Sequence, residues 1–172
     1  MAEIQEAPPA KIVIGIMYTN DHLLALTLYT LVQQFGPIEI NGPTIPFTFT
    51  TYYEEEMGKD IQKTYISFAK KIPQESLPSI KHFTNTLEQK YTIAGKRKIN
   101  IDPGYLAQHQ LVLASAKEHP YRIYLSCGIY GQIILIYTKQ GWQTLEKTFK
   151  DYQQKEVQEF LTTVRENLNK SL

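Results

Sequence analysis

The sequence is poor in cysteine, lacks long apolar runs and has no excess of charge of either sign. Cys127 is the one cysteine among 172 residues, so the chain cannot form an internal disulfide, and its apolar neighbours predict a buried thiol in a reducing environment. The longest apolar runs, such as residues 133–136, are far shorter than the roughly 20 residues that span a bilayer. The first residues also lack the basic and apolar regions of a secretion signal. Together these absences predict a cytoplasmic protein with no membrane partner.

Several motifs for phosphate, dinucleotide and metal binding are absent as well. Gly95 and Lys96 do not form a P-loop, because Lys90 occupies the earlier position where the motif requires glycine. Gly15 lies inside a predicted strand rather than after it, so no glycine triplet marks a dinucleotide-binding turn. The four histidines show no paired ligand spacing, and a single cysteine cannot build a structural zinc site. We therefore predict no metal centre from motifs and leave Mg²⁺ open as an unassigned cofactor.

Charge is balanced over the whole chain but not along it. The sequence has 18 lysines and arginines against 17 acidic residues, and 42% of its residues are hydrophobic, which excludes a disordered or uniformly basic chain. Residues 1–60 contain two cations and eight acids, whereas residues 61–172 contain 16 cations and nine acids. We expect the acidic cluster at residues 54–56 and the basic cluster at residues 96–98 to face each other across a cleft.

Residues 1–10 are predicted to be a flexible lead, and residues 11–172 a single globular domain. Hydrophobic periodicity and turn residues then predict six elements in the order strand, helix, strand, strand, helix and strand, at residues 11–18, 23–35, 47–53, 63–69, 77–91 and 97–102. Asn20 or Asp21 caps the first helix, and the last strand runs into an Asp-Pro-Gly turn. This order is that of the split β-α-β-β-α-β ferredoxin-like fold.

The remainder of the chain extends this core. Residues 107–116 suit either a short helix or a strand, residues 121–125 and 129–137 suit two strands, and a turn at residues 139–141 closes a hairpin. Asp151, with Gln154 three residues later, predicts a capping box before an amphipathic C-terminal helix. The predicted fold class is therefore α+β: an antiparallel or mixed sheet with helices on one face, in which the ferredoxin-like core is extended by a C-terminal hairpin and helix.

Three segments are dense in polar side chains beside glycine or proline, at residues 52–58, 97–105 and 115–122. The consecutive carboxylates of the first can bind a cation or act as acid and base, or else form a solvated turn. Asp102 in the second either organises a turn or belongs to a site, and the cations of the third either contact an anion or lie on an ordinary surface loop. The candidate ligand-binding residues are Tyr53, Glu56, Arg97, Asn100, Asp102, Tyr105, Lys117 and Arg122.

Short motifs in these segments, among them Tyr52-Tyr53, Glu56-Met57-Gly58 and Asp102-Pro103-Gly104-Tyr105-Leu106, recur in a family pattern that extends over about residues 11–168. On these motifs the chain resembles a bacterial family designated domain of unknown function 4416. It departs from that pattern at Tyr121, where a histidine is expected, at Gln132, where an acid is expected, and at residues 148–152, where Tyr-Pro-Asp-Tyr is usual. The resemblance implies membership but no reaction, and the departures favour binding over catalysis.

The sequence leaves three functions open and does not decide whether the protein is an enzyme. The first is binding of a small anionic ligand, phosphate-bearing or nucleotide-like, with Asp102 and Glu56 contacting a metal or hydroxyl and the basic candidates contacting the anion. The second, suggested by twelve tyrosines and a basic later part, is binding of single-stranded RNA. The third is a structural or protein-interaction module whose acidic early part meets a basic surface on a partner or on a second copy. The oligomeric state is left unassigned.

Overall fold

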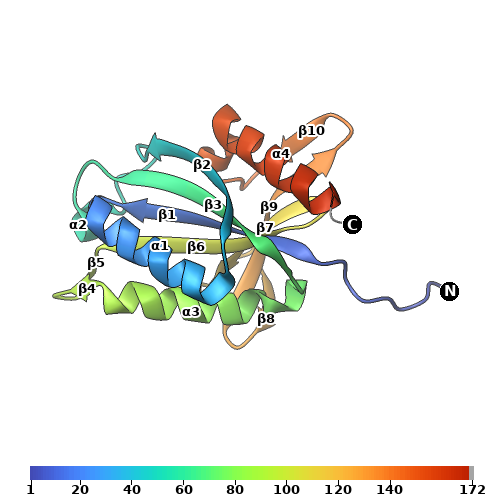
Figure 1. The fold of residues 1–172 in the computed structure, drawn as a ribbon, viewed down its shortest axis with the longest axis horizontal. Coiled ribbons are helices and arrows are strands. Elements are labelled where there is room, and N and C mark those ends of the chain that lie inside the picture. The colour runs from blue at the N-terminus through green and yellow to red at the C-terminus, as the bar shows by residue number, and fades with distance from the viewer. Residues whose placement is uncertain (171–172) are drawn as a thin grey trace.

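Strands occupy the middle of the molecule and helices lie on both sides of them in the computed structural model, which describes residues 1–170 (Figure 1). The α-helices are α1 (Asp21–Phe35), α2 (Glu54–Met57), α3 (Leu77–Lys90) and α4 (Lys155–Lys170). The strands are β1 (Ala10–Tyr18), β2 (Ile38–Pro46), β3 (Gln62–Ile72), β4 (Thr92–Ile93), β5 (Lys96–Arg97), β6 (Ile99–Leu106), β7 (Gln110–Ser115), β8 (Ile123–Ser126), β9 (Ile129–Thr138) and β10 (Gly141–Thr144). Short 3₁₀ turns precede α3 and α4, at Gln74–Ser76 and Lys150–Gln153.

Eight of the strands form one sheet. Seven follow the order β10-β9-β7-β6-β1-β3-β2, and β8 pairs with the beginning of β9, whose later part pairs with β10. The other two strands, β4 and β5, form a small separate hairpin. Every strand pair within residues 1–170 is antiparallel. The prediction of an α+β protein with an antiparallel or mixed sheet is therefore confirmed, and residues 107–116, which suited either a helix or a strand, contain strand β7.

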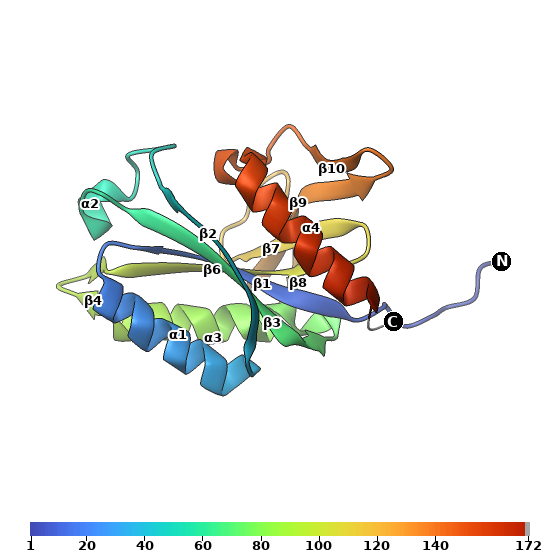
Figure 2. The same cartoon turned by 45° about the horizontal axis from the view of Figure 1, so that its top comes forward.

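Helices cover both faces of this sheet rather than the one face that we expected (Figure 2). Along β1, the side chains of Ile12, Ile14 and Ile16 belong to the core formed with α1 and α3, whereas Val13 belongs to the core formed with α4. The α4 helix buries the apolar stripe that its periodicity predicts, at Val157, Phe160, Leu161, Val164 and Leu168. Periodicity identifies the apolar side of a helix but not the face of the sheet that it covers.

The strand expected at residues 47–53 is an irregular loop instead, which we call the aromatic loop. The edge strand β2 comes earlier, and its Pro43 and Pro46 hide it in the sequence, although an edge strand tolerates proline because one of its sides is unpaired. In the aromatic loop, Phe47 makes edge-to-face contacts with both Phe49 and Tyr53. The β-branched and aromatic composition of this segment thus reflects packing of rings rather than strand pairing.

Strand β6 continues through the turn that we expected at residues 102–104. Asp102 and Pro103 pair with β1 alone, and only from Gly104 onward does β6 pair with β7 as well. Gly104 permits this close approach, since a Cβ atom there would lie 2.3 Å from the carbonyl oxygen of Val112. On the other side of Gly104, toward Ile99, β6 and β7 are unpaired. We call this divergence the fork, and it positions the site described below.

Two further expectations are corrected by the structure, and one is confirmed. Cys127 is exposed rather than buried, because it lies in the tight turn between β8 and β9, with a φ of 51°. Asp151 does not cap α4: it is buried in the 3₁₀ turn, and α4 begins after it at Lys155. Asn20 caps α1 as expected, accepting a hydrogen bond from the Leu23 N–H at 2.9 Å. A search of residues 1–170 finds no helix with the length and hydropathy to cross a membrane.

Candidate ligand-binding site

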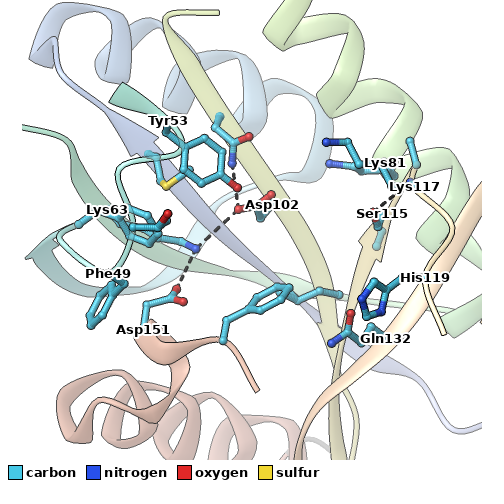
Figure 3. Close-up of a pocket in the computed structure, with 18 of the residues that line it drawn as sticks. Phe49, Tyr53, Lys63, Lys81, Asp102, Ser115, Lys117, His119, Gln132 and Asp151 are labelled. Atoms are coloured by element: carbon cyan, nitrogen blue, oxygen red, sulfur yellow. Dashed lines mark hydrogen bonds and ion pairs between the residues drawn. The ribbon is translucent and has the colours of Figure 1, made fainter. Parts of the chain in front are cut away.

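A cavity of about 840 Å³ lies at the fork, where β6 and β7 separate. Asp102 of β6 and Ser115 of β7 line it from the two arms of the fork (Figure 3). Because the sheet is interrupted here, Lys81 of α3 reaches the cavity from one face of the sheet, whereas Lys63 of β3 and Asp151 reach it from the other. The fork therefore brings side chains from both faces of the sheet to a single cavity.

On one arm of the fork a buried lysine lies between two acids, in a group that we call the lysine-centred cluster: Lys63, Asp102, Asp151, Tyr65 and Tyr152. The Lys63 side chain is 3% exposed, and its Nζ lies 2.8 Å from Asp151 Oδ2 and 3.6 Å from Asp102 Oδ2. The Tyr65 hydroxyl donates a hydrogen bond to Asp151 Oδ2 at 2.7 Å. The charge of the buried ammonium is therefore matched within the fold, as a buried cation requires.

The lysine fits at this position because the neighbouring strand β1 has no side chain there. A Cβ atom on Gly15 would lie 2.8 Å from Lys63 Cε and 3.3 Å from the Tyr152 hydroxyl oxygen. The Lys63 ammonium also lies 5.3 Å from the ring centroid of Tyr152 and 5.6 Å from that of Tyr65, within range of cation–π attraction. Gly15 is thus a packing glycine that makes room for the cluster.

The electrostatics of the cluster keep the lysine charged and the tyrosines neutral. Burial alone would lower the pKa of Lys63, but the negative charges of Asp151 and Asp102 outweigh burial and raise this pKa above its ordinary value. Burial raises the pKa of Tyr65 and of Tyr152. The ion pair with Asp151 and the charge of Asp102 therefore favour the charged form of Lys63.

Asp102 differs from Asp151 because it borders the open cavity. Its side chain is 29% exposed, and Asn100 Nδ2 donates to its Oδ2 at 2.9 Å, the same oxygen that faces Lys63. Tyr53 of the aromatic loop borders the same part of the cavity (Figure 3). Burial, with a contribution from the charge of Asp102, raises the pKa of Tyr53 to about 12. A carboxylate and a neutral phenol therefore border the cavity here, beside the amide of Asn100.

Three further cations border the cavity without forming an ion pair within residues 1–170, and we call them the cationic wall: Lys117 and Arg122, which follow β7, and Lys81 of α3. Arg122 Nη1 donates to Ser115 Oγ and to the Lys117 carbonyl oxygen, each at 2.8 Å. Its Nε donates to Gln132 Oε1 at 3.0 Å. All of these acceptors are neutral, so the guanidinium is oriented by its partners but not neutralised.

The two lysines of the cationic wall form no ion pair with these residues either, although the charge of Lys81 opposes the effect of burial on the pKa of Glu88. Lys81 is buried, and its Nζ donates to the Ile101 carbonyl oxygen at 3.3 Å. Lys117 Nζ lies 3.5 Å from the Tyr52 hydroxyl oxygen. In the described chain no carboxylate lies within 4.0 Å of any charged group of the wall. Burial lowers the pKa of Arg122, and the negative charge of Asp102 opposes this shift without cancelling it.

Arg97 belongs to a third charged group, which is closed by its own ion pairs. Its Nε and Nη2 bind the two carboxylate oxygens of Glu56 at 2.7 and 2.9 Å. Its Nη1 donates to Glu88 Oε2 at 3.1 Å and to Asn100 Oδ1 at 2.9 Å. Hydrogen bonds from Arg97 lower the pKa of Glu56, whereas burial raises that of Glu88. The acidic and basic clusters therefore do meet through these residues, but as an ion pair that joins α2 to β5 rather than across a cleft.

Most of the candidate residues border the cavity, namely Tyr53, Arg97, Asn100, Asp102, Lys117 and Arg122. Glu56 does not border it and binds Arg97 instead. Tyr105 lies on the opposite face of β6 from Asp102, in an apolar cluster, because successive residues of a strand alternate between faces. The structure thus brings six of the eight candidates to one cavity and places two outside it.

Sequence reasoning missed Lys63, Lys81 and Asp151 as residues of the cavity. A signal for the first was available, since Lys63 is a charged residue entering an apolar strand and Gly15 interrupts another strand. Lys81 carries no such signal, because a single lysine on an amphipathic helix is ordinary. Asp151 is hidden by its resemblance to a helix cap. The pairing of Lys63 with Asp151 depends on tertiary structure and has no local signature.

No group of three or more histidine, cysteine, aspartate or glutamate side chains in residues 1–170 is placed to hold a metal ion. The fold and the site define an α+β protein with a forked antiparallel sheet and a charged cavity at the fork. The family described as a domain of unknown function, DUF4416, matches residues 8–168, and the chain belongs to this family. Neither the curated proteins nor the solved structures contain a significant match to the chain.

Proposed function

We propose that the cavity at the fork binds a small anionic ligand that carries a phosphate group, such as a nucleotide-like or sugar-phosphate compound. The cationic wall supports this proposal, because its three cations border one cavity and none has a carboxylate within 4.0 Å in the described chain. Like charges in one cavity raise the free energy of the empty protein, and a bound anion relieves that cost. The proposal concerns binding, and it leaves open whether a reaction follows.

Arg122 is the group best suited to contact the anion directly. Its Nη1 and Nε are held by neutral acceptors on Ser115 and Gln132, so the plane of the guanidinium is fixed before a ligand arrives. In the described chain its Nη2 has no hydrogen-bond partner. A planar guanidinium with free N–H groups matches the geometry of phosphate oxygens. Orientation in advance also lowers the entropic cost of binding.

The remainder of the cavity suits the part of such a ligand that is not phosphate. Its volume of about 840 Å³ falls within the range of about 300–1,000 Å³ that is typical of small-molecule sites. Phe49, Tyr53 and Phe149 also line it, and aromatic side chains bind planar or sugar rings through their faces. Glu56 is not available as a metal ligand in this proposal, because Arg97 binds both of its oxygens. Magnesium is therefore a variable of the test and not part of the proposed site.

We also propose that the first part of the chain is a ferredoxin-like unit and that the protein works in the cytoplasm. The strand order β6-β1-β3-β2, with α1 and α3 as connections, supports the first statement. The exposed thiol of Cys127 supports the second, because unpaired surface cysteines persist best in reducing compartments.

A thermal-shift screen of phosphorylated compounds, with and without Mg²⁺, tests the proposed binding. A ligand at about 100 times its Kd should stabilise the protein by about 2.7 kcal/mol, which raises Tm clearly. Arg122→Ala should remove the response. Lys139→Ala, which deletes an exposed cation in the turn between β9 and β10, should preserve it. A panel without any response, or a response that survives Arg122→Ala, would contradict the proposal.

Binding of single-stranded RNA and a role in protein interaction remain alternative proposals, and each has its own test. Binding of single-stranded RNA requires aromatic rings and cations on one open surface. Tyr121 and Tyr124 are exposed and supply rings. Arg122, which lies between them in the sequence, borders the cavity instead. A protein-interaction module is favoured by the exposed apolar side chains of Ile123 and Leu125 on β8. RNA binding would show a steep dependence on salt concentration. Sedimentation of the pure protein would detect self-association.

A further inference from the structure

We infer that the ligand is a phosphorylated sugar, either free or as part of a nucleotide, and that Asp102 binds one of its hydroxyl groups. This inference rests on the proposed function, because it takes the phosphate to occupy the cationic wall. It adds the chemistry of the opposite arm of the fork, where Asp102 and Tyr53 border the cavity and Lys63 lies buried beside them.

Asp102 has one oxygen that is already engaged and one that is available. Its Oδ2 accepts a hydrogen bond from Asn100 Nδ2 at 2.9 Å and faces Lys63 Nζ at 3.6 Å. No donor contacts Oδ1 in the part of the chain that the structure describes, although the side chain borders the cavity. An ionised carboxylate accepts hydrogen bonds at both oxygens and donates none. Oδ1 therefore takes a donor from solvent in the empty protein and from the ligand in the complex.

Charge selects a hydroxyl rather than an ammonium group as the donor from the ligand. Lys63 already places a fixed positive charge 3.6 Å from Asp102, and Asp151 holds that ammonium in position at 2.8 Å. A cationic group bound to Asp102 would lie close to the Lys63 ammonium, and like charges repel strongly where water is excluded. A neutral hydroxyl avoids this repulsion and still forms a charge-assisted hydrogen bond with the carboxylate.

Tyr53 supplies a second group that suits a sugar. Its phenol is protonated at neutral pH, as that of an ordinary tyrosine is, and can both donate and accept a hydrogen bond; burial raises its pKa further, to about 12. Tyr53 and Asp102 border the same part of the cavity (Figure 3). A molecule with phosphate at one end and neighbouring hydroxyls at the other matches both arms of the fork, and this is the arrangement of a sugar phosphate.

Calorimetric titration of the full chain with matched probes tests the inference. Ribose 5-phosphate is compared with tetrahydrofurfuryl phosphate, which keeps the ring and the phosphate but lacks the ring hydroxyls. We expect the hydroxylated probe to bind at least about 10-fold more tightly, because hydrogen bonds to charged groups contribute that factor or more. Adenosine 5′-phosphate and its 2′,3′-dideoxy form repeat the comparison for a nucleotide.

Asp102→Asn isolates the proposed contact. The variant should lose most of the preference for hydroxylated probes, whereas its affinity for the hydroxyl-free probes should not fall, because the cationic wall is untouched and a negative charge is removed from the cavity. Asp60→Asn, the same substitution at an exposed aspartate, should keep the preference of the wild type. The Tm of each variant without ligand reports whether it folds. If Asp102→Asn does not fold, the comparison of probes on the wild type decides the inference alone.

The outcomes separate this inference from the proposed function. Equal affinities within both probe pairs, or a preference that survives Asp102→Asn, overturn the inference while leaving the binding of phosphate compounds intact. Absence of binding by every phosphate-bearing probe overturns the inference together with the proposed function. A preference seen in the nucleotide pair alone supports the inference and identifies a nucleotide as the source of the sugar phosphate.

Discussion

Two buried lysines at the cavity hold their positive charge in different ways. Lys63 is surrounded by two carboxylates and by aromatic rings, whereas Lys81, which is also buried, donates to one carbonyl oxygen. Both lysines line the same cavity. Burial alone therefore does not distinguish a cation that the fold neutralises from one that we propose to contact a ligand. The distinction lies in whether the fold itself supplies the opposite charge.

Removal of each buried ammonium in turn is the strongest test of this comparison. Lys63→Met leaves Asp151 buried without its counter-charge, and breaking a buried ion pair costs about 3–5 kcal/mol. Lys81→Met removes a charge that forms no ion pair within 4.0 Å in the described chain but attracts the Glu88 carboxylate, so we expect a smaller loss, of about 1 kcal/mol. Urea unfolding of both variants at neutral pH measures the two values. If both variants lost the same free energy of unfolding, the counter-charge would not be what distinguishes the two lysines.

The next test makes one small change on each arm. Gly15→Ala places a Cβ atom 2.8 Å from Lys63 Cε, and since the ion pairs restrain that side chain, we expect a loss of about 1–3 kcal/mol. Ser115→Ala deletes a neutral acceptor of Arg122, which keeps its other partners, so the expected loss is below about 1 kcal/mol. Thermal unfolding of both variants provides the comparison. A larger loss for Ser115→Ala would mean that the cationic wall is the better-packed arm.

Sequence patterns predicted the fold where the side chains alternate regularly. Strand β1 and helix α1 have clear periods, and the structure confirms both and identifies Asn20 as the cap where the sequence left Asn20 or Asp21 open. The edge strand β2 was missed because Pro43 and Pro46 interrupt its pattern. The face of the sheet that α4 covers depends on long-range packing, and no local pattern carries that information.

The candidate site was predictable to the extent that its residues lie in polar segments at strand ends. Asp102 and Arg122 were found in this way, and the fork brings them to one cavity. The fork itself depends on the close approach of Gly104 to Val112, and no sequence motif predicts that contact. The pairing of Lys63 with Asp151 joins distant parts of the chain, so it could be recognised only once the strand order was known.

Arg97 provides an intermediate case, in which a cavity cation is neutralised by an acid at a partly exposed position. Its hydrogen bonds lower the pKa of Glu56 below the usual 4.5, so ionised Glu56 stabilises the fold above that pH, and the contribution disappears as the pH falls through the lowered pKa. Glu56→Gln should cost about 1 kcal/mol at neutral pH, a value appropriate to a pair that water partly screens.

Unfolding measured against pH checks the contribution of Glu56. The difference between the wild type and Glu56→Gln should shrink as the solution becomes more acidic than pH 4.5. Glu55→Gln, at the neighbouring exposed position of α2, is the matched control and should behave as the wild type does. A difference that is constant with pH would mean that the glutamine disturbs packing rather than charge.

The smallest expected effect concerns the ionisation of Tyr53. Tyr53→Phe keeps the ring and its contact with Phe47, so the free energy of unfolding should change by less than about 1 kcal/mol at neutral pH. Because burial and the charge of Asp102 raise the pKa of Tyr53 to about 12, the wild type should lose stability relative to the variant as the pH rises from the ordinary value of 10.0 toward 12. Unfolding curves in this range measure that divergence. If the stabilities of the wild type and the variant changed in parallel with pH, the phenol would be more hydrated than the structure indicates. The part of the cavity around Asp102 would then be less shielded from water than the proposed binding of a hydroxyl group requires.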